Sequence, residues 1–89
     1  PGLRRESTAL NRLIESVIED YRARPAAADH LLEVEADPAV DKLLIDPLKV
    51  TQVLENLIDN ALKYSAKGSR VVVTSKLHTT EVEVCVRDN

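Results

Sequence analysis

The sequence has little cysteine, little glycine and no long apolar run. Among its 89 residues Cys85 is the only cysteine, which excludes a disulfide framework and a cysteine-based zinc site. No apolar stretch approaches the length of a membrane span. With only two glycines, the chain has no phosphate-binding loop of the Walker type. The residue pattern also supports no Ser-His-Asp or Cys-His catalytic grouping.

The charge balance and the length narrow the class of protein further. Twelve Lys and Arg residues against fifteen Asp and Glu give a net charge of -3, whereas a nucleic-acid-binding face is basic. We therefore expect no nucleic-acid partner. With 44% hydrophobic and 30% charged residues, the chain is long enough for one domain with a modest core. We expect a cytoplasmic domain that makes no direct contact with a membrane. This expectation holds whether or not the parent protein carries a membrane anchor elsewhere.

Two segments have the apolar spacing of an amphipathic helix. The first runs over residues 10–21, and Ser7-Thr8 before it offers N-cap side chains. The second runs over residues 50–62 and follows Asp46-Pro47, a capping residue and a proline suited to the first helical position. This second helix is expected to end near Ser65.

The remaining segments are predicted to be strands. Short strands are expected at residues 30–35 and 43–45. Residues 70–77 are rich in β-branched side chains and residues 81–87 alternate between apolar and polar, with a short link between the two runs. This arrangement predicts an antiparallel hairpin. The order helix, strands, helix, hairpin indicates an α+β two-layer sandwich with both helices on one face of the sheet.

Three polar side chains form a narrow stripe on the second helix. At about 100° per residue, Asn60 lies about 40° to one side of Asn56 and Lys63 about 20° to the other. A solvated face is the ordinary interpretation of such a stripe. However, asparagine is unfavourable inside a helix, so two asparagines lower the intrinsic stability of this helix. A carboxamide oxygen suits Mg²⁺ and a lysine suits phosphate, which favours a ligand site.

The segment "QVLENLIDNALKYS", residues 52–65, resembles the N-box of sensor histidine kinases. The hairpin then runs into "VRDN", residues 86–89, which is similar to the start of that family's glycine box. The resemblance implies the two-layer α/β ATPase fold, the Bergerat type, shared with gyrase and the heat-shock chaperone of ninety kilodaltons. It implies a connector from an upstream domain at residues 1–7. Residues 8–89 are then the N-terminal part of the ATP-binding catalytic domain, incomplete at its C-terminus.

Carried over to this sequence, the resemblance implies a role for five residues. Asn60 is expected to bind Mg²⁺, and Asn56 to support the metal and the phosphates. Lys63 is expected to reach the phosphate chain, and Tyr64 to border the nucleotide. Asp88 is expected to accept a hydrogen bond from the amino group of adenine, because a carboxylate pairs with an amine and repels a carbonyl. No catalytic residue is expected within the chain, because the phospho-accepting histidine of the family lies on a separate domain.

The implied function is phosphoryl transfer in a two-component phosphorelay. The γ-phosphate of Mg-ATP would pass to a histidine on the upstream dimerisation domain of a homodimeric parent, and then to a response regulator receiver domain. Without a completed glycine box and lid, the 89 residues alone are expected to bind ATP weakly and to be inactive. Three alternatives stay open: an anti-sigma serine kinase or another ATPase of the superfamily, a degenerate non-catalytic binding or dimerisation module, and a purely structural α+β domain.

Overall fold

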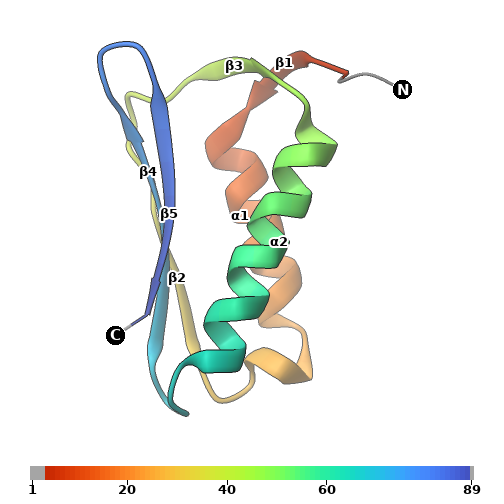
Figure 1. Ribbon diagram of the computed structural model, residues 1–89, viewed down its shortest axis with the longest axis vertical. Coiled ribbons are helices and arrows are strands. Elements are labelled where there is room, and N and C mark those ends of the chain that lie inside the picture. Colours follow the sequence, from red (N-terminus) through yellow and green to blue (C-terminus); the bar gives the residue numbers. More distant parts are fainter. Residues whose placement is uncertain (1–3, 89) are drawn as a thin grey trace.

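A three-stranded sheet with two helices on one of its faces forms the body of the molecule (Figure 1). The structure is a computed structural model and describes residues 4–88. Its elements are, in chain order, β1 (Glu6–Ala9), α1 (Leu10–Arg22), a 3₁₀ turn η1 (Pro25–Ala27), β2 (Leu31–Glu35), β3 (Lys42–Ile45), α2 (Pro47–Tyr64), β4 (Arg70–Leu77) and β5 (Val82–Asp88). The predicted α+β two-layer architecture is confirmed.

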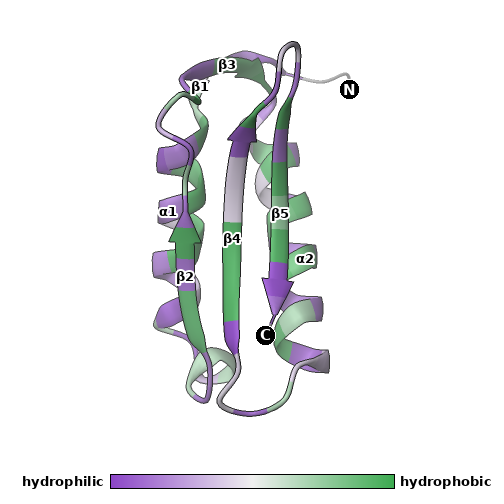
Figure 2. Cartoon of the chain, turned by 90° about the vertical axis from the view of Figure 1, so that its left-hand side faces the viewer, coloured by the Kyte–Doolittle hydropathy of each residue, from purple (hydrophilic) through white to green (hydrophobic). Residues whose placement is uncertain are grey.

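The main sheet has the strand order β2-β4-β5. Strand β4 lies in the centre, parallel to β2 and antiparallel to β5, so the predicted hairpin is confirmed. Helix α1 lies behind β2 and helix α2 behind β5, and the opposite face of the sheet is open (Figure 2). Helices α1 and α2 lie side by side (Figure 1).

The start of the chain differs from the sequence-based expectation. Ser7 and Thr8 do not cap a helix but belong to β1, where they pair with Leu44 and Leu43 of β3. Helix α1 begins directly after this strand and has no side-chain cap. The backbone groups of this segment bond to β3, and a partner more than thirty residues away is invisible to local pattern reasoning. The expected connector at residues 1–7 therefore overlaps β1, and residues 1–3 lie outside the described part.

The core lies between the sheet and the two helices. Its fully buried members include Ile14 and Ile18 of α1, Leu54 and Ile58 of α2, and Val71 and Val73 of β4. Burying a side chain of this size contributes about 1.5–3 kcal/mol through the hydrophobic effect. The apolar spacing of both helices thus serves one shared core, which fixes α2 against the sheet.

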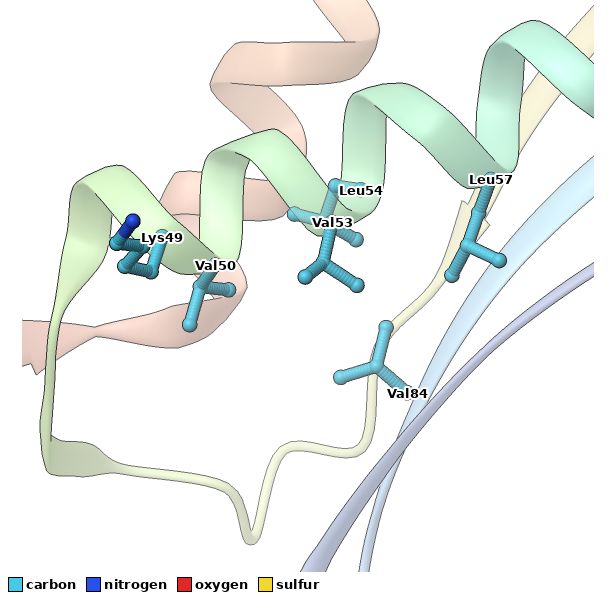
Figure 3. Close-up of a pocket in the computed structure, with 6 residues that line it drawn as sticks. All are labelled: Lys49, Val50, Val53, Leu54, Leu57 and Val84. Carbon is cyan, nitrogen blue, oxygen red and sulfur yellow. The ribbon is translucent and has the colours of Figure 1, made fainter.

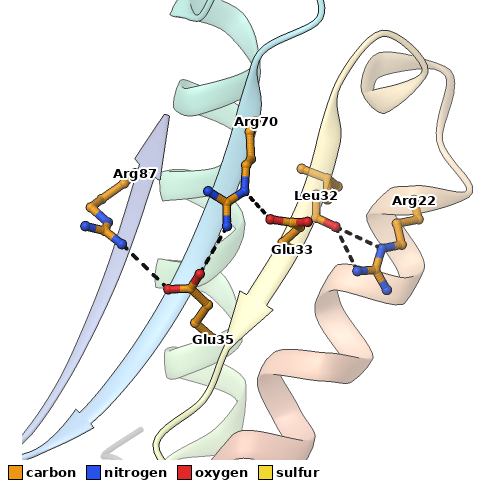
Figure 4. A network of polar contacts seen from close by, with 6 residues as sticks. All are labelled: Arg22, Leu32, Glu33, Glu35, Arg70 and Arg87. Atoms are coloured by element: carbon orange, nitrogen blue, oxygen red, sulfur yellow. Dashed lines mark hydrogen bonds and ion pairs between the residues drawn. The ribbon is translucent and has the colours of Figure 1, made fainter. Parts of the chain in front are cut away.

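Charged side chains lie on the face of the main sheet that the helices do not cover. Arg70 pairs with Glu33 and with Glu35, and Arg87 lies 3.8 Å from Glu35 (Figure 4). Val72, between Glu33 and Arg87 in register, is also buried. Exposed ion pairs of this kind contribute little free energy each, because water screens them. Their main effect here is to cover an apolar side chain on a face that no described helix covers.

The two ends of α2 are defined by different contacts. The Asp46 carboxylate accepts hydrogen bonds from the backbone N–H groups of Leu48 and Lys49, so the predicted cap is confirmed. The helix ends at Tyr64, with Ser65 as its C-cap. Gly68, the next glycine, has φ +82° and shapes the following turn, a conformation that other residues rarely adopt.

Candidate functional site

Helix α2 carries the three side chains of the predicted stripe. It is continuous from Pro47 to Tyr64, so Asn56, Asn60 and Lys63 lie on one face, and all three are exposed. Within residues 4–88 no protein group hydrogen-bonds to either carboxamide, and the side-chain hydrogen bonds to α2 involve other residues. The two asparagines thus have no structural partner among the described residues that would explain their unfavourable position inside a helix.

The C-terminal end of α2 places Lys63 and Tyr64 next to one another. The Lys63 ammonium lies 5.2 Å from the centre of the exposed Tyr64 ring. A lysine in the last turn also interacts favourably with the helix dipole, so its position has a structural reason as well. The Ser65 hydroxyl lies 3.0 Å from Nε2 of His30, which ties this end of the helix to the start of β2.

Asp88 comes from the sheet rather than from the helix. It is the exposed last residue of β5 and is paired in register with Val71. The end of β5 lies beside the C-terminal half of α2 (Figure 1). Among the described residues, no hydrogen bond or ion pair joins Asp88 to the stripe. The structure thus brings four of the five predicted residues together on one helix, with the fifth on a neighbouring strand.

Tyr21 makes the main polar contact between the two helices. Its side chain is 1% exposed, its hydroxyl donates to Oδ1 of Asp59 at 2.7 Å, and it lies 3.2 Å from the Glu55 carbonyl oxygen. Burial, together with the hydrogen bond to Asp59, raises the pKa of Tyr21 to about 12. The guanidinium of Arg24 lies 4.1 Å from the centre of the ring. From the sequence, Tyr21 is only the last residue of the first amphipathic segment, because its contact with Asp59 depends on how the two helices pack.

An apolar groove runs between α2 and β5 (Figure 3). Val53 and Leu57, which the helical spacing assigns to the core stripe, are 57% and 40% exposed and line this groove with Val50 and Val84. Its volume is about 210 Å³, below the roughly 300 Å³ of a usual ligand pocket. The groove also follows the N-terminal half of α2, away from Lys63. We therefore do not identify it with the predicted site.

The described residues supply no ready-made metal centre. In residues 4–88, no group of three or more His, Cys, Asp and Glu side chains is arranged to hold a metal ion. A Mg²⁺ ion bound through phosphates, waters and one or two protein oxygens needs no such group. The exposed Asn60 carboxamide offers one such protein oxygen. None of the described helices is long and apolar enough to cross a membrane.

Comparison with known proteins shows which family the chain belongs to and which solved folds it is similar to. Residues 45–89 match the family described as histidine kinase-, DNA gyrase B- and HSP90-like ATPase. The chain is 38% identical over 90 residues to the adaptive-response sensory kinase SasA of Synechococcus sp. (strain JA-2-3B'a(2-13)), covering 97% of this chain and 23% of that protein. Its fold is similar to the catalytic domain of histidine kinase ThkA, with a TM-score of 0.87 and 24% identity, over 98% of this chain and 60% of that one.

A second ThkA structure, in complex with the response regulator protein TrrA, matches with a TM-score of 0.83 and 25% identity. That match covers 96% of this chain and 25% of the other. Because the family model covers half of the sequence, the chain belongs to the histidine kinase-, DNA gyrase B- and HSP90-like ATPase family. The chain spans 23% of the length of the SasA relative.

Proposed function

We propose that this chain is the N-terminal part of the ATP-binding catalytic domain of a cytoplasmic sensor histidine kinase module. The observation that carries the proposal is the exposed face of α2, on which Asn56, Asn60 and Lys63 project together. Membership of the ATPase family and similarity to a sensory kinase over nearly the whole chain support it. They favour a histidine kinase over an anti-sigma serine kinase or a non-catalytic module.

The proposed roles of the residues follow from their chemistry. Lys63 attracts the phosphate chain with a point charge, and Asn56 donates and accepts hydrogen bonds along the same face of the helix. Tyr64, exposed beside Lys63, offers an aromatic surface to the nucleotide. Asp88, at the end of β5, accepts a hydrogen bond from the amino group of adenine, which selects adenine against guanine.

Asn60 is the residue we propose as the protein ligand of Mg²⁺. When bound, Mg²⁺ neutralises part of the charge of the triphosphate. The chain's own contribution is to hold the nucleotide in a fixed orientation, with a carboxamide and an ammonium aimed at the phosphates. In phosphoryl transfer such positioning and charge stabilisation supply most of the catalysis.

The proposed partners lie outside this chain. The γ-phosphate would pass to a histidine on a dimerisation domain of a homodimeric parent, and from there to a response regulator. The ThkA complex with TrrA supports a response regulator as the class of partner. The net charge of -3 and the acidic pI of about 5.3 disfavour nucleic acid as a partner.

The test is autophosphorylation of the full-length protein with Mg-ATP. Replacing Asn60→Ala should lower the rate by about 100-fold or more, the size of effect found when one preorganised charge-stabilising group is lost. Ser16→Ala is the control, because Ser16 is an exposed polar side chain on α1, away from the stripe. It should leave the rate unchanged. Normal activity of the Asn60→Ala variant would overturn the metal assignment, and an inactive wild type would overturn the proposed function.

A further inference from the structure

We infer that Tyr21 and Asp59 form a clamp between α1 and α2 that sets the direction of the asparagine stripe. The Tyr21–Asp59 clamp consists of the Tyr21 side chain with its contacts to Asp59 and to the Glu55 carbonyl. The inference rests on the proposed function. It assigns positioning roles to two residues that the resemblance to the kinase family does not assign.

The clamp is a directional contact next to the apolar core contacts that hold α2 in place. The Tyr21 hydroxyl donates to Oδ1 of Asp59 at 2.7 Å and lies 3.2 Å from the carbonyl oxygen of Glu55. The ring is buried at 1% exposure, so the hydroxyl has little freedom to move. Leu54 and Ile58 hold α2 against the core, but hydrophobic burial has no preferred direction. A hydrogen bond such as this part-buried one, in contrast, weakens steeply when its angle changes.

The clamp holds α2 at the residues directly before the two asparagines. Glu55 precedes Asn56, and Asp59 precedes Asn60, so the contact extends over two successive turns of the helix. Each residue of a helix is offset by about 100° around the axis from the residue before it. Because Glu55 and Asp59 contact α1, Asn56 and Asn60 therefore point away from α1. Contacts with Tyr21 at two positions one turn apart restrict the rotation of α2 about its own axis. The rotation of α2 determines where the Asn56 and Asn60 carboxamides point.

The other side of the stripe has no comparable support among the described residues. There Val53 and Leu57 are exposed and border the open groove beside β5. A rotation of α2 by about 20° would move a side-chain atom about 6 Å from the axis by about 2 Å. A displacement of only about 1 Å is enough to cost about 100-fold in rate at a preorganised site. We therefore expect the clamp to act on nucleotide binding and phosphoryl transfer without touching the nucleotide.

Arg24 completes the contact on the outside of the tyrosine ring. Its guanidinium lies over the ring and 3.9 Å from the Glu55 carboxylate, and it also pairs with Asp20. A cation over the face of a tyrosine stabilises the ring in place. Because Tyr21→Phe keeps the ring, this stacking survives the substitution. The variant therefore isolates the hydroxyl.

The experiment measures kcat and KM for Mg-ATP in autophosphorylation of the full-length protein. Tyr21→Phe and Asp59→Ala should each lower kcat/KM about tenfold, because the helix can then rotate out of its productive orientation. Asp59→Asn keeps an oxygen acceptor and should restore most of the lost kcat/KM. The double variant Tyr21→Phe with Asp59→Ala should be no worse than either single variant, as expected for two groups that act as one unit.

Ser75→Ala is the control for a merely structural effect. Ser75 is also buried, at 5% exposure, and its hydroxyl donates to Oδ1 of Asn11 at 2.7 Å. It belongs to β4, so its loss should lower the melting temperature and leave kcat/KM unchanged. All rates are measured at a temperature where melting curves show each variant to be folded.

The outcomes separate this inference from the proposed function. If Asn60→Ala is inactive but Tyr21→Phe behaves like Ser75→Ala, the clamp is structural and the inference is overturned while the function stands. Additive losses in the double variant would also overturn it. If Asn60→Ala keeps full activity, the proposed use of the stripe fails, and the clamp loses the role inferred for it.

Discussion

At the scale of single residues, Asp46 shows how one carboxylate organises the start of α2. One oxygen accepts from the N–H groups of Leu48 and Lys49, at 3.1 and 3.2 Å, and the other from the N–H of Arg4 at 2.9 Å. These donors stabilise the charged form, with Arg4 contributing most, and hold the pKa of Asp46 below its usual value of 3.8. The cap therefore connects the N-terminal segment to the helix that carries the candidate site.

This lowered pKa gives a pH-dependent prediction. Because the folded-state pKa lies below the unfolded value of 3.8, the carboxylate stabilises the fold above that pH. The contribution is lost as the pH falls through the folded-state pKa. Asp46→Asn retains a capping oxygen but cannot ionise. The wild type should melt higher than Asp46→Asn at about pH 7, and the difference should shrink steadily below about pH 4. Melting curves at several pH values test this, and a difference independent of pH would contradict it.

The residues of the candidate site were predictable to different degrees. Asn56, Asn60 and Lys63 lie in one helix, so their common face follows from the helical period alone. The contact of Tyr21 with Asp59 spans 38 positions of sequence and depends on the packing of α1 on α2, which no local pattern contains. The exposed apolar side chains of the groove were also missed, because an apolar stripe in a sequence does not say how much of its width becomes buried.

At the scale of elements, α2 has two kinds of apolar side chain. Leu54 is 2% exposed and packs in the core, whereas Leu57, one turn later, is 40% exposed in the groove. Leu54→Ala should lower the free energy of unfolding by about 2–5 kcal/mol, because it leaves a cavity in the core. Leu57→Ala should cost clearly less, since water already reaches the side chain and no closed cavity forms. Urea unfolding of both variants tests this, and equal losses would contradict the difference in burial.

The elements themselves were largely predictable, and their pairing was not. The two helices, the hairpin and the strands near residues 31–35 and 42–45 follow from periodicity, capping and β-branched content. The pairing of β1 with β3 and the parallel pairing of β2 with β4 join segments separated by more than thirty residues. Strand β1 was missed because its four residues, "ESTA", are mostly polar and contain good helix caps.

At the scale of the whole molecule, the two sheets differ in how well they are supported. Strand β4 has a neighbour on each side, and Val71, Val72 and Val73 are fully buried. The β1–β3 ribbon lies at one end of the molecule (Figure 1) and consists of four residue pairs. Leu44 in it is exposed. Because local opening is easiest where few apolar contacts hold the backbone, we expect the two sheets to have different local stabilities.

Hydrogen exchange of the native protein measures this difference directly. The amides of Val71 to Val73 should exchange only through global unfolding, since these residues belong to the central strand and their side chains are buried. The hydrogen-bonded amides of β3 should exchange faster, through a local opening that is insensitive to low denaturant concentrations. The amides of α2 around Ile58 should follow β4, because Ile58 shares its core. Such a pattern would mean that the helix carrying the asparagine stripe is held by the stable part of the molecule and is rigid before any ligand binds. Equal exchange rates in β3 and β4 would contradict it and would mean that the molecule opens as one unit.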